Sequence, residues 1–290
     1  MRNDILLKYR KFVKDFTNLH NNARQLPIGD YDVVAENANP TYKVLIFSPH
    51  PDDECIIGAL PLRLKNEQNA EVINIAVTLG STKERKQERL EELTNACKSL
   101  GFKLLLPGEL ALDAVYLKTK EDSPKKWQAK VATIVEIIKN EKPDMLLFPH
   151  NNDFNSTHIG VYHLVTDAIK QIITKSPDFN PAIIETEFWH MMEKPNLMIG
   201  LSEDDEALLV YALSAHTKEV ERNPYHINHP ARMIDNVMRG AEVVGGEGGH
   251  APKMDFAMLY RHSRIINGTI TPEPTNKVFG TEDDLSEIIH

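Results

Sequence analysis

Short apolar runs alternate with longer segments of helical periodicity through most of this chain. The apolar runs predict buried strands at residues 43–47, 72–77, 103–106, 145–148 and 183–189. Apolar positions that recur every three or four residues predict helices between the strands, at residues 55–66, 83–100, 127–139 and 159–174. The alternation predicts an α/β fold with a Rossmann-like, mostly parallel sheet that is flanked by helices.

Both ends of the chain depart from this alternation. Further helices are predicted at residues 4–20, 203–221 and 231–244. The glycine cluster at residues 245–249 predicts a loop. It is not a dinucleotide-binding motif, because its spacing and context differ from those of that motif. We expect an N-terminal helix with its lead-in, one α/β domain with an irregular helical C-terminal elaboration, and a loosely docked tail. The bounds of these three parts are residues 1–42, 43–265 and 266–290.

Composition narrows the classes of function. The chain has 33 basic and 42 acidic residues, and its net charge of -9 disfavours nucleic acid as a partner. Its charged start does not resemble a secretory signal, and no segment is as apolar and long as a membrane span. A soluble cytoplasmic protein is expected, and homo-oligomerisation is left open. Cys55 and Cys97 are the only cysteines, so no disulfide framework is predicted.

Candidate chemistry follows the first predicted strand. The apolar run ends abruptly in residues 48–54 (SPHPDDE), and open α/β sheets place their functional groups beyond the carboxyl ends of strands. Imidazole and carboxylate together can bind zinc or ferrous iron, and a second carboxylate can take a proton from water. Asp52 and Asp53 can therefore divide these roles. Capping of a helix is the alternative for the acids, but it does not account for His50.

The same pattern recurs after the strand predicted at residues 145–148. Here the apolar run ends in proline and opens into polar residues up to His158, at the start of the next predicted helix. His158 can therefore point into the same crevice as His50 and Asp53. A histidine in this position alone is more often a surface or capping residue. The two loops together favour a metal site with three protein ligands.

These two loops carry a family resemblance. Residues 49–54 (PHPDDE), with the later pattern of Asp153, Asn155 and His158, resemble the PIG-L or LmbE-like family of metal-dependent de-N-acetylases. The resemblance extends from residue 43 to about residue 260. It implies a hydrolase that removes the N-acetyl group from an N-acetylglucosamine-type sugar or glycoconjugate, so that its partner is a small molecule.

The resemblance also implies roles for individual residues. His50, Asp53 and His158 are the implied ligands of a zinc ion, with Fe²⁺ as the alternative metal. Asp52 is the implied general base that activates water at zinc. The resulting products are acetate and a free amino sugar.

One position departs from the family pattern. The family often has a His-x-x-His pair, whereas this chain has Asn155 three residues before His158. An asparagine amide can donate a hydrogen bond to the oxyanion of the reaction, but it carries no charge. His216 is the candidate to replace the missing imidazole, because its surroundings resemble the family's later His-x-Ser-Gln segment without the Ser-Gln. An ordinary helix histidine is the alternative for His216.

Further residues are candidates for substrate binding. Arg89 and Glu92 have the spacing of the family's Arg-x-x-Glu, which implies a contact of Arg89 with sugar or phosphate. An ion pair between these two residues along one helix is the alternative. Asp113 is at the place of a family acid that contacts sugar hydroxyls.

Three other functions remain open from the sequence. An amidase for a larger thiol-sugar conjugate would share the same site. A metal-containing sugar-binding protein with weak or lost deacetylase activity would account for Asn155 in place of histidine. A magnesium-assisted phosphate site is disfavoured, because Mg²⁺ prefers oxygen ligands and gives no reason for two histidines.

Overall fold

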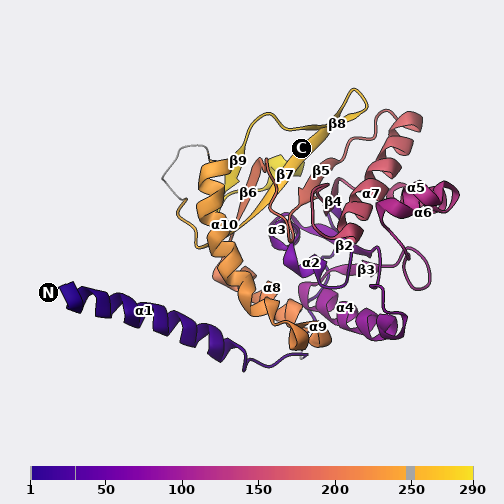
Figure 1. Cartoon of the computed structure of the whole chain (residues 1–290). Helices are drawn as coiled ribbons and strands as arrows, with labels where there is room; N and C mark the ends of the chain where they lie inside the picture. The colour runs from indigo at the N-terminus through magenta and orange to yellow at the C-terminus, as the bar shows by residue number, and fades with distance from the viewer. Residues whose placement is uncertain (1, 30, 246–251, 290) are drawn as a thin grey trace.

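One twisted sheet forms the centre of the molecule (Figure 1). The computed structural model describes residues 2–29, 31–245 and 252–289, and within them the sheet has 9 strands. Their order is β3-β2-β1-β4-β5-β7-β6-β9, and β8 pairs with β7. The strands are β1 (Tyr42–Ser48), β2 (Ala70–Ala76), β3 (Lys103–Leu105), β4 (Met145–Pro149), β5 (Ala182–Thr186), β6 (Leu197–Leu201), β7 (Phe256–Ile266), β8 (Thr269–Pro272) and β9 (Lys277–Phe279).

The first five strands are parallel, as the alternation of apolar runs and helices predicts. Val44 of β1 pairs with Val72 of β2 on one side and with Met145 of β4 on the other. The chain thus builds β2 and β3 on one side of β1, and then crosses to build β4 and β5 on the other. This crossing makes the carboxyl ends of β1 and β4 the topological switch point, where α/β sheets hold their ligands.

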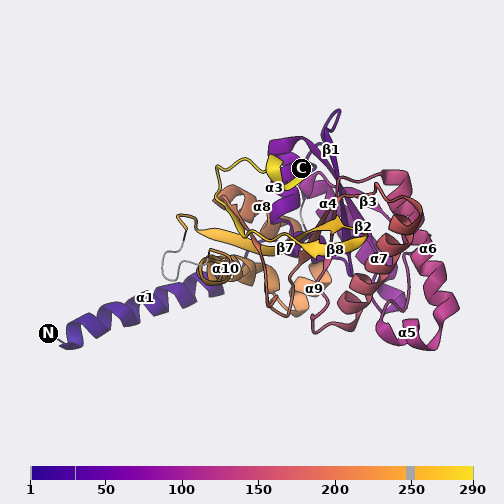
Figure 2. The same ribbon diagram turned by 90° about the horizontal axis from the view of Figure 1, so that it is seen from above.

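Helices cover both faces of this sheet (Figures 1 and 2). Leu45 and Phe47 of β1 face the layer of α6 and α7, whereas Val44 and Ile46 face the layer that contains α3, α4 and α8. The helices are α1 (Arg2–Ala23), α2 (Asp53–Ile56), α3 (Ala59–Gln68), α4 (Lys86–Leu100), α5 (Leu117–Asp122), α6 (Pro124–Glu141), α7 (Ser156–Lys175), α8 (Glu203–Ser214), α9 (Thr217–Arg222), α10 (His229–Val243) and α11 (Ser286–Ile289), with the 3-10 turns η1 (Lys83–Arg85) and η2 (Tyr225–Asn228).

The helix predicted at residues 55–66 is two helices in the structure. α2 ends at Ile56 and α3 starts at Ala59. A Cβ atom on the intervening Gly58 would lie 2.4 Å from Cδ2 of Leu209, so this turn is pressed against α8. The helix predicted at residues 203–221 is likewise divided, into α8 and α9. Its break falls at Ala215 and His216, where the chain turns toward the site.

The C-terminal part of the chain is more ordered than the sequence predicts. β6 and β7 were not predicted, and β7 runs antiparallel to both β5 and β6. The segment expected to be a loosely docked tail adds β8 and β9 to the sheet. Leu285 and Ile288 are fully buried beyond them. The glycine cluster lies outside the described residues, except for Gly245.

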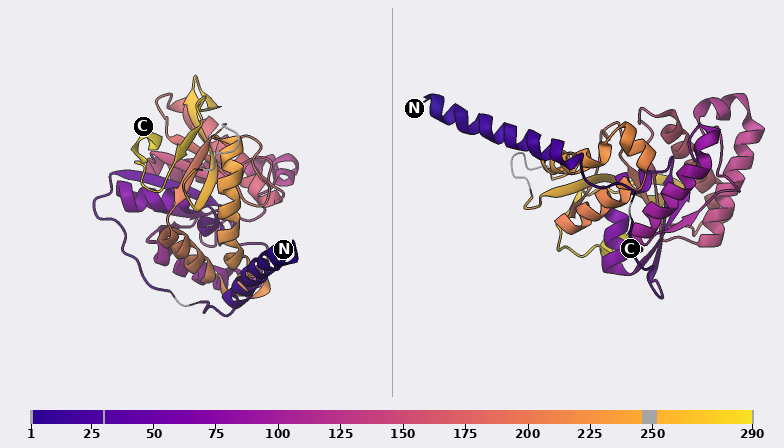
Figure 3. Two further views of the ribbon diagram at one scale, coloured as in Figure 1. Left: turned by 90° about the vertical axis from the view of Figure 1, so that its left-hand side faces the viewer. Right: turned by 90° about the horizontal axis from the view of Figure 1, so that it is seen from below.

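The N-terminal helix α1 projects from the body of the molecule (Figures 1 and 3). Its last turn is tied to η2, where Nε2 of His20 lies 2.6 Å from Oδ1 of Asn228. The lead-in then returns to the body, and the backbone N–H of Val34 donates to the carbonyl of Lys98. Among the described residues, no helix combines the length and the apolar character needed to cross a bilayer.

A close contact between α7 and a loop gives a test of the packing around the site. A Cβ atom on Gly160 would lie 2.1 Å from the carbonyl oxygen of Val115, and this atom belongs to backbone that cannot rotate away. Alanine gains about 1 kcal/mol over glycine in a helix, but overpacking costs about 1–3 kcal/mol. We therefore expect Gly160→Ala to destabilise the protein by up to about 2 kcal/mol in denaturant unfolding. Lys170→Ala on the exposed side of α7 should change stability by less than about 0.5 kcal/mol.

Candidate metal centre and active site

Three side chains converge where β1 and β4 end. His50 and Asp53 follow β1, and His158 lies in the first turn of α7, after the loop that follows β4. Nδ1 of His50 lies 3.2 Å from Nε2 of His158, and Oδ2 of Asp53 lies 3.4 Å from each of these nitrogens. The two loops predicted to meet are therefore brought together, although the two histidines are 108 residues apart in the chain.

The spacing of these three donor atoms fits a tetrahedral metal ion. Ligands at 2.0–2.1 Å from zinc are about 3.3–3.4 Å apart in tetrahedral geometry. Nitrogen and carboxylate donors suit zinc and ferrous iron better than magnesium. Asp53 is further fixed because its Oδ2 accepts a hydrogen bond of 2.8 Å from the backbone N–H of His50. These three residues therefore form a candidate site for a divalent cation.

The electrostatics of the cluster also favour a cation. Although burial opposes ionisation, His158 and His50 hold the pKa of Asp53 below its usual value. Burial opposes protonation of His158, yet Asp53 and Asp153 raise its pKa to about 10. Oδ2 of Asp153 lies 3.6 Å from Nδ1 of His158, on the side of the ring away from Asp53. In metal sites, a carboxylate commonly faces the ring nitrogen of a histidine ligand that is turned away from the metal, and it fixes the orientation of the ring.

Asp52 adopts a strained backbone conformation beside this cluster. Its φ of 109° lies in a region that residues other than glycine rarely adopt. Its N–H donates to Oε2 of Glu54 at 3.0 Å, and the hydroxyl of Tyr225 donates to its Oδ2 at 2.6 Å. The Asp52 side chain forms no capping hydrogen bond to α2, so helix capping does not explain this acid. Burial, together with the negative charge of Asp53, raises the pKa of Asp52 to about 7.

His216 does not lie where a substrate could touch it. Its side chain is fully buried, and its Nε2 lies 2.8 Å from Oε1 of Glu54. The expectation that it replaces the missing imidazole at the oxyanion is therefore wrong for a direct contact, because burial excludes substrate from the ring. Glu54 joins His216 to the backbone of Asp52, so His216 supports the conformation of Asp52 from behind. Although burial acts against it, Glu54 raises the pKa of His216.

Asn155 lies at the N-terminus of α7 and, like His50, lines a cleft. Its Oδ1 accepts a hydrogen bond of 2.8 Å from the N–H of Thr157, which makes it the cap of this helix. Because the oxygen is engaged by a backbone donor, the amide nitrogen is the group left for other contacts. Asn155 thus keeps a hydrogen-bond donor at the position where the family often has histidine.

A cleft of about 670 Å³ opens beside His50. Arg89, Asp113 and Asn155 all line it. Their contact with substrate stays a prediction. The remaining lining residues are Thr78, Gly80, Ser81, Lys83, Leu112, Ala114, Val115, Tyr116, Ser156 and Thr157.

Arg89 and Glu92 do not form the simple helix ion pair that was the alternative. Arg89 donates to the carbonyl of Pro51 at 3.1 Å, and among the described residues its buried Nε has no hydrogen-bond partner. Oε1 of Glu92 instead accepts hydrogen bonds from the Thr217 hydroxyl and the Lys218 N–H. Arg89 therefore keeps donor capacity at the cleft. Asp113 is an exposed acid that pairs with Lys86.

Several residues that shape the site have no role predicted from the sequence. Tyr225 lies 173 residues from Asp52 in the chain, and no local pattern marks it. Asp153 accepts hydrogen bonds from the N–H groups of Asn155 and Trp189, besides facing His158. The ring of Phe188 packs edge-on against His158, with centroids 4.5 Å apart. Only Asp153 had a sequence signal, since it belongs to the second motif.

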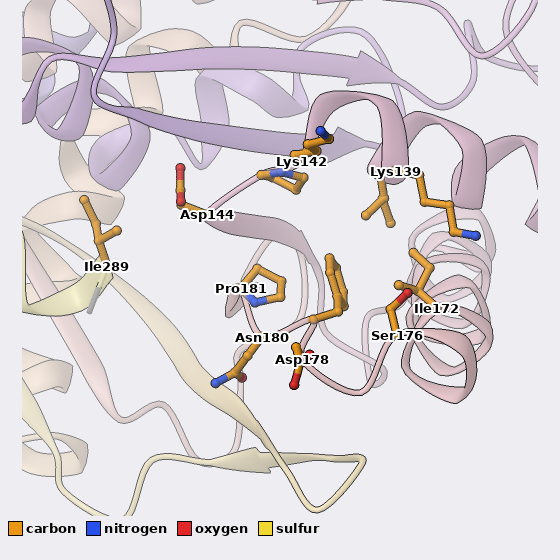
Figure 4. Close-up of a pocket in the computed structure, with 12 residues that line it drawn as sticks. Lys139, Lys142, Asp144, Ile172, Ser176, Asp178, Asn180, Pro181 and Ile289 are labelled. Carbon is orange, nitrogen blue, oxygen red and sulfur yellow. The ribbon is translucent and has the colours of Figure 1, made fainter.

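Other histidines and another depression lie away from these ligands. Nε2 of His150 lies 2.9 Å from the carbonyl oxygen of His190, and His229 pairs with Glu206. A depression of about 400 Å³, lined by residues such as Lys139 and Lys142, lies near the amino ends of β4 and β5 (Figure 4). It is therefore at the opposite edge of the sheet from the metal ligands. The candidate metal site lies instead at the carboxyl ends of the parallel strands.

Comparison with known protein families gives a match over part of the chain. Residues 45–169 match the family described as PIG-L, GlcNAc-PI de-N-acetylase. This segment holds both motifs, so the match confirms the resemblance to the PIG-L/LmbE-like deacetylases that was drawn from them. Comparison with curated protein sequences gives no match.

Solved structures share the α/β fold at low sequence identity. The N,N'-diacetylchitobiose deacetylase of Pyrococcus horikoshii is 18% identical, with a TM-score of 0.56 over 89% of this chain and 93% of its own. The hydratase GalB of Pseudomonas putida is 16% identical, with a TM-score of 0.57 over 77% of this chain and 96% of its own. Teicoplanin deacetylase Orf2, solved in a zinc-inhibited form, is 11% identical, with a TM-score of 0.53 over 80% of this chain and 99% of its own. These similarities confirm the predicted fold class.

Metal content tests whether His158 holds the metal and Asp52 does not. His158→Ala removes one of three donors, so we expect metal affinity to fall at least about 100-fold and metal to be lost on dialysis. Asp52→Asn should retain nearly full metal content, because Asp52 is not one of the three donors. Elemental analysis of the purified variants measures both. Equal loss of metal in the two variants would contradict this division of roles.

Proposed function

We propose that this protein is a metal-dependent hydrolase that removes the N-acetyl group from an N-acetylglucosamine-type sugar or glycoconjugate. The observation that supports this most directly is the donor triangle of His50, Asp53 and His158, with separations of 3.2–3.4 Å. Asp52 adds a second carboxylate in the same turn, outside the triangle. A Lewis-acid metal with a base beside it is one arrangement that can hydrolyse an unactivated amide.

The metal would be zinc or ferrous iron, held by His50, Asp53 and His158. When bound, it supplies Lewis-acid chemistry, which polarises an amide carbonyl and makes water more acidic. His158 presents Nε2 to this position, because the Asp153 carboxylate faces its Nδ1. Phe188 packs against the same ring and keeps it from turning.

Asp52 is the base in this proposal. It takes a proton from the attacking water and returns one to the nitrogen as the C–N bond breaks, which yields acetate and a free amine. Burial and the charge of Asp53 raise the pKa of Asp52 above that of an ordinary carboxyl group, which makes it a stronger base. Tyr225 holds Oδ2, so the other carboxylate oxygen is the one that handles the proton.

The cleft residues suit a polar ring. Arg89 offers guanidinium donors, Asp113 offers acceptors, and a cavity of about 670 Å³ is large enough for a sugar with a substituent. Asn155 lines this cleft with a free amide donor, and we assign to it the hydrogen bond to the developing oxyanion. A neutral donor stabilises that charge less than imidazolium does, so a slow enzyme is expected.

The competing hypothesis is a metal-containing sugar-binding protein with weak or lost deacetylase activity. Asn155 supports it, because the amide oxygen is committed to capping α7 and no charged group replaces the histidine. Release of acetate separates the two hypotheses. A binding protein would hold N-acetylated sugars without producing acetate.

The test is an acetate assay on the metal-loaded protein. The substrates are N-acetylglucosamine, its phosphate, a lipid conjugate and a thiol conjugate, each at saturating concentration. We expect acetate from at least one of them, and we expect Asp52→Asn to reduce kcat by at least about 1,000-fold with metal retained. Binding of these sugars without acetate from any of them would favour the competing hypothesis.

Tyr225 gives a finer test of how Asp52 is held. Tyr225→Phe removes only the hydroxyl that donates to Asp52, so the cost should be that of one hydrogen bond to a charged group, about 1.5–3 kcal/mol. We expect kcat to fall about 10- to 100-fold while metal content is unchanged. Tyr162→Phe on α7 is the matched control and should leave kcat unaltered. An effect of Tyr225→Phe on KM alone would argue against its role in orienting the base.

A further inference from the structure

The helix α1 has an apolar stripe that nothing in the described structure covers. Its residues recur at intervals of four and three, which places them along one side of the helix. Their exposed fractions are 60% for Ile5, 66% for Tyr9, 65% for Phe12, 55% for Phe16 and 69% for Leu19. We call α1 the arm and these five residues the arm stripe.

An uncovered stripe of this kind needs a partner. A helix of 22 residues is about 33 Å long, and a helix with no tertiary packing is marginal in water. Exposed apolar patches that are large and continuous mark interaction surfaces in soluble proteins. The arm stripe therefore indicates a docking surface.

A second exposed apolar face lies on α10, on the same side of the molecule. Ile234 and Met238 are one turn apart on this helix and are 48% and 62% exposed. α10 begins directly after η2, to which the arm is tied through His20 and Asn228. Figures 1 and 3 show that α1 projects outward from the side where α10 is exposed. The arm therefore points away from its own α10 and leaves that face open.

The charges of the two surfaces are complementary. Between residues 4 and 23 the arm has four basic side chains, Lys8, Arg10, Lys11 and Lys14, against two acidic ones. The exposed face of α10 carries Asp235 and Glu242, and the whole chain has a net charge of -9. A basic arm is thus attracted to the acidic body of another copy. The same acidic body would be repelled by an anionic lipid surface.

We propose that two copies of this chain form a twofold dimer in which each arm packs its stripe against α10 of the other copy. When a twofold axis relates the two copies, this exchange is self-complementary and closes at two, because each chain supplies one arm and receives one. With both arms engaged, the buried area is on the order of 2,000 Å², which is within the range of stable interfaces. The proposal is independent of the reaction that the site catalyses.

Light scattering after size-exclusion chromatography of the full chain tests this dimer. We expect a mass of twice 32.9 kDa for the unmodified protein. Phe12→Asp/Phe16→Asp should give a monomer, and Ile234→Asp/Met238→Asp should do the same from the other side of the interface. Asn18→Asp adds a charge to the polar side of the arm and should leave the dimer intact. All of these positions except Asn18 are exposed apolar residues, so thermal unfolding should show folded variants throughout.

Cross-linking tests the exchange itself. Phe16→Cys and Met238→Cys are made in separate chains, mixed, and treated with a short bifunctional maleimide; the native Cys55 and Cys97 are buried. We expect a cross-linked pair from the mixture, and much less from either variant alone.

Three results would overturn the proposal. One is an unmodified protein that is monomeric at about 100 µM, since interfaces of this size have dissociation constants from micromolar to picomolar. Another is a dimer that persists in both double variants. The third is a monomer that sediments with phosphatidylserine vesicles and loses this binding in Phe12→Asp/Phe16→Asp, which would assign the arm stripe to a lipid surface.

Discussion

The parallel pairing of β1 with β4 is the constraint on which the site depends. Val44 pairs with Met145, so both strands end at the same edge and their loops leave side by side. The first loop brings His50 and Asp53, and the second leads into α7 with His158. Because β2 and β3 are built on the far side of β1, the edge between β1 and β4 is free of crossing connections. The donor triangle follows from this topology.

Neighbouring residues offset the cost of buried charge and of strained backbone at the donor triangle. Buried Asp53 and Asp153 need positive charge, which His158 supplies as a protonated ring and which a divalent cation would supply when bound. The unfavourable backbone of Asp52 is maintained by Glu54 and Tyr225, and Glu54 is in turn held by buried His216. Strain of this kind persists only where several contacts determine it. η2 carries Tyr225 and also anchors α1, so the site and the arm share one segment.

The fold alone does not choose the reaction. Deacetylases and a hydratase both resemble this chain in structure at less than 20% identity, so the function has to be argued from the site. The family motifs point to deacetylation, and the arrangement of Asp52 outside the donor triangle is consistent with it. Asn155 is the main departure, because it caps α7 and lines the cleft with an uncharged donor. Its effect is expected on the rate and not on the type of reaction.

The sequence by itself determined the parallel half of the sheet and the three candidate metal ligands. Apolar runs that end in His50 or lead to His158 are local signals, because buried strands and the loops after them are contiguous in the chain. Tertiary structure alone decided that Tyr225 meets Asp52, that His216 is buried behind Glu54, and that β6, β7, β8 and β9 extend the sheet. These contacts join residues more than a hundred positions apart or strands of mixed direction, where no periodicity records the partner. Packing is a property of the folded chain, so residues that act only through distant neighbours leave no local pattern.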